Sequence, residues 1–353
     1  MRDRVIASGA LVASLTALLC FGPAGLLAGG AAAQEGTAYA AHFNRGQESM
    51  QQMKFHDAAS EFREAATLNP DYLPAQQALA VAYAVSENFA MAWKQVRLLR
   101  QSKVDLPEEF LRRLRESLSE SEADKQLQNI DKDLASAQKS ASEHPEDPAL
   151  QAAWGTALSK AGDYAAAMHA AERALVLDST QPEAHFLLGS MLGGEPPNSE
   201  QAIPHLKMYL QHVLRTPETS KNITDAYSML GDIYGRSGRE QQALEAYEEG
   251  IKTGTNEDSL SNNASWIYST AQDASLRNPQ KALAYARKAV ALSNGKKAHV
   301  LDTLGEALYA NGLFDEAVAT EKKAIALQPG EGLYADQLKK FQAAKDHGGK
   351  TKP

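Results

Sequence analysis

Residues 148–181, PALQAAWGTALSKAGDYAAAMHAAERALVLDSTQ, contain two amphipathic segments around the turn Lys160-Ala161-Gly162-Asp163. Large and small apolar residues recur at helical spacing and form a stripe along one side of each segment. These residues are Trp154, Leu158, Tyr164, Ala171, Ala174 and Leu177. Gly155 and Ala167 are small where two antiparallel helices must approach closely. The stretch therefore predicts a helix–turn–helix.

The same pattern returns 34 residues further along the chain. A step of that length leads from Pro148 to Pro182 and from Gly155 to Gly189. Earlier in the chain, the same step links Phe55 to Phe89, Ala58 to Ala92, Phe62 to Val96 and Ala65 to Leu99. Small and large residues recurring in a fixed order indicate an array of repeats.

Two further stretches have the clearest order of residues. They are Phe55-x-x-Ala58…Phe62…Ala65…Leu68-x-Pro70 and Leu304-Gly305…Gly312-x-Phe314…Ala317…Ala324…Leu327-x-Pro329. In this order the sequence resembles the tetratricopeptide repeat family, whose unit is a helix–turn–helix of 34 residues. The resemblance covers residues 39 to about 346. It implies an all-α fold, a right-handed α-α superhelix (TPR solenoid) of about seven to eight repeats with a C-terminal capping helix.

The repeats also predict how the chain is divided. Repeats are expected over 39–106 and again over 148–346, where the last helix covers the final apolar face. Residues 107–147 fit the repeat poorly and are richer in charge, so they are either a degenerate helical repeat or a flexible linker. The tail, 347–353, consists mainly of Gly, Lys, Thr and Pro and is expected to be disordered.

Residues 1–33 have the pattern of a secretory signal peptide. Arg2 and Arg4 precede an apolar run over 5–21, and Ala31-Ala32-Ala33 provides small residues for cleavage. The sequence therefore predicts export from a bacterial cell, with the mature protein periplasmic or secreted. Two alternatives stay open: a retained membrane anchor, and lipidation at Cys20, which follows Leu19 where lipoprotein signals need a small residue.

Charge and motif content argue against several functions. The net charge is −8 and no block of Lys or Arg stands out, so a nucleic-acid surface is not expected. His205 and His212 are seven residues apart, but neither has a cysteine nearby to complete a zinc site. The segment Gly348-Gly349-Lys350-Thr351 resembles the end of a phosphate-binding loop, yet it has Ala344 where the loop needs glycine. We expect no catalytic residues, metal, cofactor or small-molecule substrate.

In the family that the chain resembles, the second, fifth, ninth and twelfth places of each repeat face a concave groove. Carried over to this sequence, these places give the candidate partner-binding residues Phe43, Gln47, Phe186, Asp232, Tyr268, Asp302, Glu306 and Tyr309. Aromatic residues beside carboxylates suit peptide or helix segments of other proteins. The acidic residues near the C-terminal end favour a basic or neutral partner. The same aromatic residues also suit packing between repeats, so the two interpretations stand together.

The sequence thus predicts a non-catalytic protein–protein interaction scaffold or adaptor in the cell envelope. One alternative is a membrane-tethered assembly factor, and N-terminal sequencing separates the two because a start at Gln34 excludes the tether. Another is a glycan-binding module in which Trp266, Tyr268 and Tyr309 stack on sugars.

Overall fold

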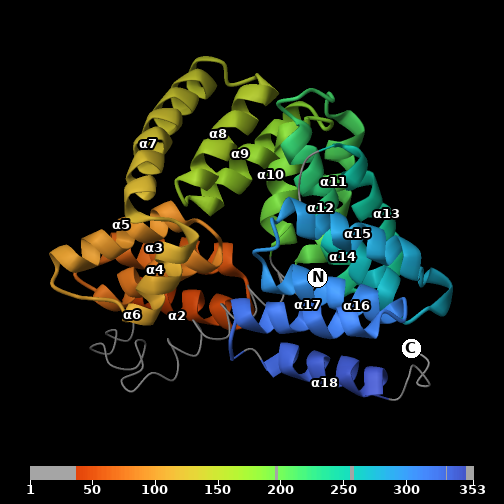
Figure 1. Cartoon of the computed structure of the whole chain (residues 1–353). Helices are drawn as coiled ribbons and strands as arrows, with labels where there is room; N and C mark the ends of the chain where they lie inside the picture. The colour runs from red at the N-terminus through yellow and green to blue at the C-terminus, as the bar shows by residue number, and fades with distance from the viewer. Residues whose placement is uncertain (1–36, 195–197, 255–257, 331, 347–353) are drawn as a thin grey trace. The chain divides into compact units, whose positions relative to one another are not determined.

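A computed structural model describes residues 37–194, 198–254, 258–330 and 332–346 (Figure 1). The described residues form helices, turns and loops and include no β-strand. They divide into two compact units, an N-terminal unit that ends at Val213 and a C-terminal unit that begins at Leu214. The prediction of an all-α fold built from successive helix pairs is confirmed. The expected signal peptide and C-terminal tail lie outside the described residues.

The N-terminal unit contains ten helices among its described residues. They are α2 (Ala38–Gln51), α3 (Phe55–Leu68), α4 (Leu73–Val85), α5 (Phe89–Gln101), α6 (Glu108–Ser117), α7 (Glu120–Glu143), α8 (Pro148–Lys160), α9 (Tyr164–Leu177), α10 (Pro182–Gly193) and α11 (Ser199–His212). The C-terminal unit contains α12 (Ser220–Arg236), α13 (Glu240–Lys252), α14 (Asp258–Thr270), the 3₁₀ helix η1 (Ala274–Leu276), α15 (Pro279–Leu292), α16 (Ala298–Ala310), α17 (Phe314–Leu327) and α18 (Gly332–Asp346). In the described part of the chain, no helix is both long and apolar enough to cross a membrane.

The turns that precede α9, α13 and α17 share one backbone feature. The residue before the N-cap of the second helix has a positive φ, which is 74° for Gly162 and for Gly312 and 72° for Gly238. Glycine adopts this conformation without the steric cost that other residues meet. In the α8–α9 turn, the N-cap side chain also helps to begin the next helix, because Asp163 accepts a hydrogen bond from the amide of Ala166. The residues of the turn itself therefore determine its backbone conformation.

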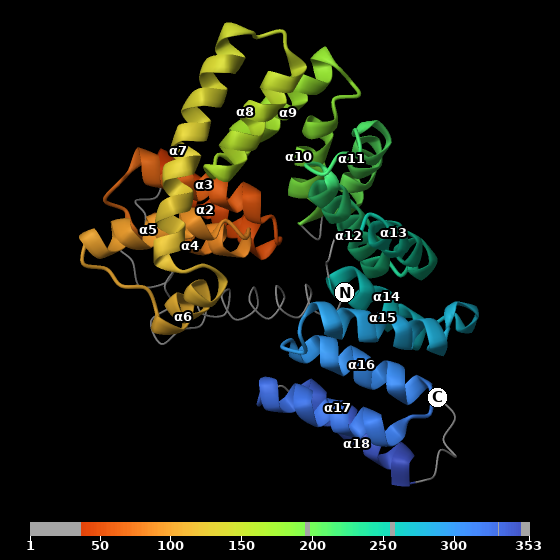
Figure 2. The same ribbon diagram turned by 45° about the horizontal axis from the view of Figure 1, so that its top comes forward.

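Residues 107–147 form α6 and α7, and α7 packs on α5 and on α8 (Figure 2). The indole Nε1 of Trp93 donates a hydrogen bond of 2.8 Å to the carbonyl oxygen of Leu118. Ser119 caps α7 through a capping box with Glu122. The segment is therefore helical and packs within the N-terminal unit, and the division of the chain falls after it, between Val213 and Leu214.

The N-terminal unit also has contacts between helix pairs that are far apart in sequence. Tyr83 on α4 donates a hydrogen bond of 3.3 Å to the carbonyl oxygen of Gly162 in the α8–α9 turn. The amide nitrogen of the Asn88 side chain is 3.1 Å from the carbonyl oxygen of Lys160. Arg63 on α3 forms an ion pair of 2.6 Å with Asp163. In a simple solenoid each repeat contacts only the repeats next to it. The contacts of α3, α4 and Asn88 with the α8–α9 turn therefore go beyond the repeat architecture, and we call them the closure of the N-terminal unit.

In the C-terminal unit the helices α12 to α17 pack as successive pairs, and α18 follows on α17 and α16 (Figure 2). The connection between α14 and α15 contains η1. On α18, Tyr334, Phe341 and Ala344 are buried. This helix covers apolar surface of the last pair, as a capping helix does.

Candidate functional site

The candidate residues of the N-terminal unit lie near its apolar interior. Phe43 leaves 4% of its surface exposed, and its ring centre is 5.5 Å from that of Phe62. Gln47 is half-buried, one helical turn further along α2. Phe186 is half-buried and its ring centre lies 4.9 Å from that of Tyr209. Phe43 and Phe186 therefore pack against other aromatic rings, while partner binding by these two residues and by Gln47 stays a prediction.

Asp232 is buried and joins three helices of the C-terminal unit. Its Oδ1 accepts a hydrogen bond of 2.7 Å from the hydroxyl of Tyr247 on α13 and one of 3.2 Å from the side-chain amide of Asn263 on α14. Burial raises the pKa of Tyr247 well above its ordinary value, and the charge of Asp232 adds to the effect. Tyr247 thus stays a neutral donor to a buried carboxylate. Asp302, on α16, is also buried.

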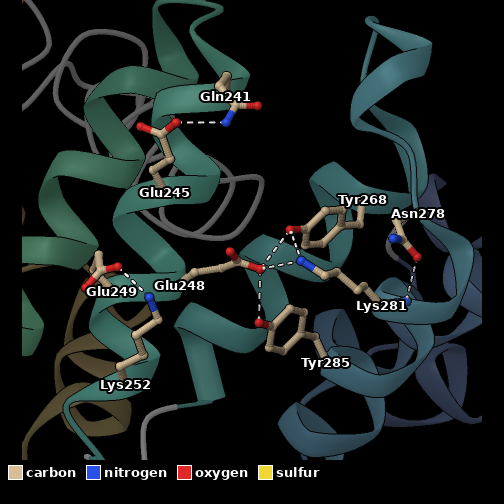
Figure 3. A network of polar contacts seen from close by, with 9 residues as sticks. All are labelled: Gln241, Glu245, Glu248, Glu249, Lys252, Tyr268, Asn278, Lys281 and Tyr285. Atoms are coloured by element: carbon tan, nitrogen blue, oxygen red, sulfur yellow. Dashed lines mark hydrogen bonds and ion pairs between the residues drawn. The ribbon is translucent and has the colours of Figure 1, made fainter.

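Tyr268 belongs to a group of four polar residues from three helices, the Tyr268 cluster, which consists of Glu248, Tyr268, Lys281 and Tyr285 (Figure 3). Oε1 of Glu248 on α13 accepts hydrogen bonds from Tyr268 on α14 at 2.7 Å, from Tyr285 on α15 at 3.1 Å and from Lys281 on α15 at 3.2 Å. The ammonium of Lys281 is also 3.0 Å from the hydroxyl of Tyr268 and 5.0 Å from the centre of its ring. The carboxylate of Glu248 and the hydroxyl of Tyr268 thus both contact the ammonium of Lys281.

The ionisation of the Tyr268 cluster follows from these contacts. Partial burial works to raise the pKa of Glu248, but hydrogen bonds from Tyr268, Lys281 and Tyr285 outweigh it and hold that pKa below its ordinary value. Hydrogen bonds to Tyr268 and Glu248 raise the pKa of Lys281. Burial and the charge of Glu248 raise the pKa of Tyr285 to about 12. Near neutral pH the cluster therefore holds a charged carboxylate and a charged ammonium.

A second group with the same chemistry, the Tyr309 cluster, consists of Glu306, Tyr309, Gln337 and Lys340. The ammonium of Lys340 on α18 is 2.7 and 2.6 Å from the two carboxylate oxygens of Glu306 on α16. The same ammonium is 4.5 Å from the ring centre of Tyr309, and Gln337 donates a further hydrogen bond of 3.0 Å to Glu306. Burial, followed by the charge of Glu306, raises the pKa of Tyr309.

Tyr268 and Tyr309 occupy corresponding places in consecutive repeats, four residues after Ala264 and Gly305. Of the predicted residues, the structure brings Glu306 and Tyr309 together, whereas Tyr268 lies with residues that the repeat positions do not indicate. Glu248, Lys281 and Tyr285 come from the second helices of their pairs, and Lys340 comes from beyond the last repeat. The only sequence signal for them is the recurrence of tyrosine at one repeat place.

Two histidines in the N-terminal unit form a separate pair. Nδ1 of His185 is 2.9 Å from Nδ1 of His205, and Nε2 of His185 is 3.0 Å from the carbonyl oxygen of Ser179. A carbonyl oxygen only accepts, so His185 donates from Nε2; when its ring is neutral, its Nδ1 accepts the hydrogen bond from Nδ1 of His205. Burial and the neighbouring His185 lower the pKa of His205. No three His, Cys, Asp or Glu residues in the described ranges are grouped so as to hold a metal ion.

Two stretches of the chain match family models described as Tetratricopeptide repeat: residues 152–202, which include most of α8 to α10, and residues 224–253, which include most of α12 and α13. No curated protein matches the chain. Proteins of this family are in general non-catalytic scaffolds for protein–protein interaction.

Several solved structures are similar to the chain at low sequence identity. One is the C-terminal part of a TPR repeat-containing protein from Cytophaga hutchinsonii, with 17% identity, a TM-score of 0.37, and coverage of 84% of this chain and 99% of that one. Another is yeast Tom70, with 12% identity, a TM-score of 0.41, and coverage of 97% and 72%. The TPR2AB domain of yeast Sti1, in a complex with pHSP90, has 15% identity, a TM-score of 0.30, and coverage of 87% and 98%. The family assignment rests on the sequence matches and on the helix pairs: the chain is a tetratricopeptide repeat protein.

Proposed function

We propose that this protein is a non-catalytic scaffold of the bacterial cell envelope that binds peptide or helix segments of partner proteins. The observation that carries the proposal is that a tyrosine at the same place of two consecutive repeats in the C-terminal unit lies beside a glutamate and a lysine. Aromatic rings beside charged groups are the side chains that most often anchor protein partners. Location in the envelope is supported by the signal-like sequence of residues 1–33.

In both clusters the lysine side chain is more exposed to solvent than the glutamate side chain. Most residues of α14 and α16 are buried, including Asp302 and Glu306. The lysines are more exposed, with 51% of the Lys281 side chain and 40% of the Lys340 side chain accessible. A partner therefore meets Lys281 on α15 and Lys340 on α18 rather than an open row of carboxylates.

The two alternatives from the sequence have different support. Sugar-binding sites present open aromatic faces, but the ammonium of Lys340 lies over the ring of Tyr309, and the hydroxyl of Tyr268 already bonds to Glu248 and Lys281, which weakens the glycan-binding alternative. A membrane-tethered assembly factor differs from the scaffold only in the fate of residues 5–33. N-terminal sequencing of the mature protein therefore tests that alternative, because a start at Gln34 excludes the tether.

Photo-crosslinking in cells tests the scaffold directly. A photoreactive residue at Ala284, exposed on α15 one helical turn after Lys281, is expected to capture a small, reproducible set of envelope proteins. The control position is Lys322, exposed on α17 of the same unit. Products at position 284 that are absent at position 322 support the proposal. Identical products at both positions, or none at either, contradict it.

A further inference from the structure

The Tyr268 and Tyr309 clusters have the composition of sites for a primary ammonium group. In each, one ammonium is ion-paired to a glutamate and contacts a tyrosine: Lys281 lies 3.0 Å from the hydroxyl of Tyr268, and Lys340 lies over the ring of Tyr309, 4.5 Å from its centre. An aromatic face attracts a cation through its quadrupole, and a carboxylate strengthens the hydrogen bonds of an ammonium. In both clusters a tyrosine at the same repeat place thus contacts a lysine ammonium that is paired with a glutamate.

The lysine in the Tyr309 cluster comes from outside the repeats. Lys340 lies on α18, which packs on α17 and α16 after the last helix pair, and Gln337 on the same helix binds the same glutamate. The ring of Phe341 stacks on that of Tyr309 with centres 5.4 Å apart. In effect, α18 shows how a separate helix delivers a lysine to the tyrosine and carboxylate of a repeat.

The Tyr268 cluster is the more accessible of the two. The side chain of Glu248 is 27% exposed, compared with 5% for that of Glu306 beneath α18. Lys281 reaches Glu248 from α15 on a long side chain that is half exposed, and such surface ion pairs contribute little to stability. Exchange of Lys281 for an incoming ammonium therefore has a small cost. The ring of Tyr285 lies nearly parallel to that of Tyr268, with centres 6.1 Å apart, and borders the same place.

We propose that the Tyr268 cluster is a binding site for a lysine side chain of a partner protein, and that Lys281 occupies this site in the free chain. This inference rests on the proposed scaffold function and specifies the chemistry of its partner. In the bound state, the partner's ammonium donates to Glu248 and to the hydroxyl of Tyr268, and the displaced Lys281 side chain moves into solvent.

The test uses the full chain and a defined probe, the blocked pentapeptide acetyl-Gly-Gly-Lys-Gly-Gly-amide. Lys281→Met vacates the site and is expected to bind this peptide about tenfold more tightly than the unsubstituted chain does, because the competing ammonium is gone. The double substitution Lys281→Met/Glu248→Gln is expected to lose that gain. Binding is measured by isothermal titration calorimetry. Lys281→Ala provides a second vacated variant if the methionine variant does not fold.

Lys252→Met is the matched control, because Lys252 forms an exposed ion pair with Glu249 on α13 and the pair is separate from the Tyr268 cluster (Figure 3). This variant is expected to bind the peptide as the unsubstituted chain does. Equal binding by both lysine variants, or equal binding of a peptide with norleucine in place of lysine, overturns the inference. Photo-crosslinks at Ala284 that persist in such a case leave the scaffold function standing and reject only the lysine site.

Discussion

Replacement of Gly162 by Ala is expected to lower the local stability of α8 and α9 by about 2–5 kcal/mol. One part of the loss is backbone strain, because φ is 74° at this residue and an alanine there costs about 1–2 kcal/mol. The other part is steric, since a Cβ atom would lie 2.5 Å from Cε1 of the buried Tyr83 ring. Such overpacking costs about 1–3 kcal/mol. Hydrogen exchange of peptides from α8 and α9, followed with increasing urea, measures the change.

Gly312→Ala separates the two contributions. Gly312 has the same φ of 74° in the corresponding turn of a later repeat, but no atom lies within 4 Å of a Cβ added there. Gly312→Ala is therefore expected to lower stability by the backbone strain alone, and the loss is measured by hydrogen exchange in α16 and α17. In a Tyr83→Ala background, the penalty at Gly162 is expected to fall to the value at Gly312. Equal losses at Gly162 and Gly312 in the unsubstituted chain would show that α4 does not contact the α8–α9 turn.

The sequence was sufficient to predict the helix pairs. Proline and aspartate at the helix starts, glycine in the turns and small residues at close approaches all act within one repeat. For this reason the segments on either side of the turn at Gly162 correspond to α8 and α9. A pattern that repeats every 34 residues also predicts which residues pack together within a helix pair and between neighbouring helix pairs.

The closure of the N-terminal unit was not predictable in this way. Tyr83 and Asn88 contact Gly162 and Lys160, which are more than 70 residues away in sequence. Whether such residues meet depends on small rotations that accumulate from pair to pair, and periodicity does not encode their sum. The residues themselves are an ordinary tyrosine and an ordinary N-cap asparagine, so neither marks a distant contact.

The candidate site was predictable to a smaller extent than the fold. Repeat position indicates the side of a helix on which Tyr268 and Glu306 lie, but not which other chain segment covers that side. Lys340 covers Glu306 because α18 continues the stack beyond the last repeat, and Glu248 reaches Tyr268 from the preceding pair. Phe43 illustrates the same point, because Phe62 and Tyr72 surround a residue that repeat position assigned to the groove.

Trp93→Ala is expected to have the largest effect on the N-terminal unit, a loss of about 3–5 kcal/mol. The indole is fully buried, and its Nε1 donates to the carbonyl oxygen of Leu118, immediately before the capping residue Ser119 of α7. The substitution leaves a cavity next to α5 and removes the bond that fixes the start of α7. Hydrogen exchange in α6 and α7 is therefore expected to accelerate together with exchange in α5.

Two controls make the Trp93 result specific to residues 107–147. Trp93→Phe keeps an aromatic ring but removes the donor to Leu118. We expect it to lower the stability less than Trp93→Ala does, with at least about 1 kcal/mol of the loss due to the missing hydrogen bond. Trp266→Ala alters a half-buried tryptophan of the C-terminal unit and is expected to leave exchange in α6 and α7 unchanged. If Trp93→Ala destabilises α5 while α6 and α7 exchange as before, the segment behaves as a linker. If all three helices lose protection together, residues 107–147 are a cooperative part of the unit, and the repeats on either side of them fold as one body.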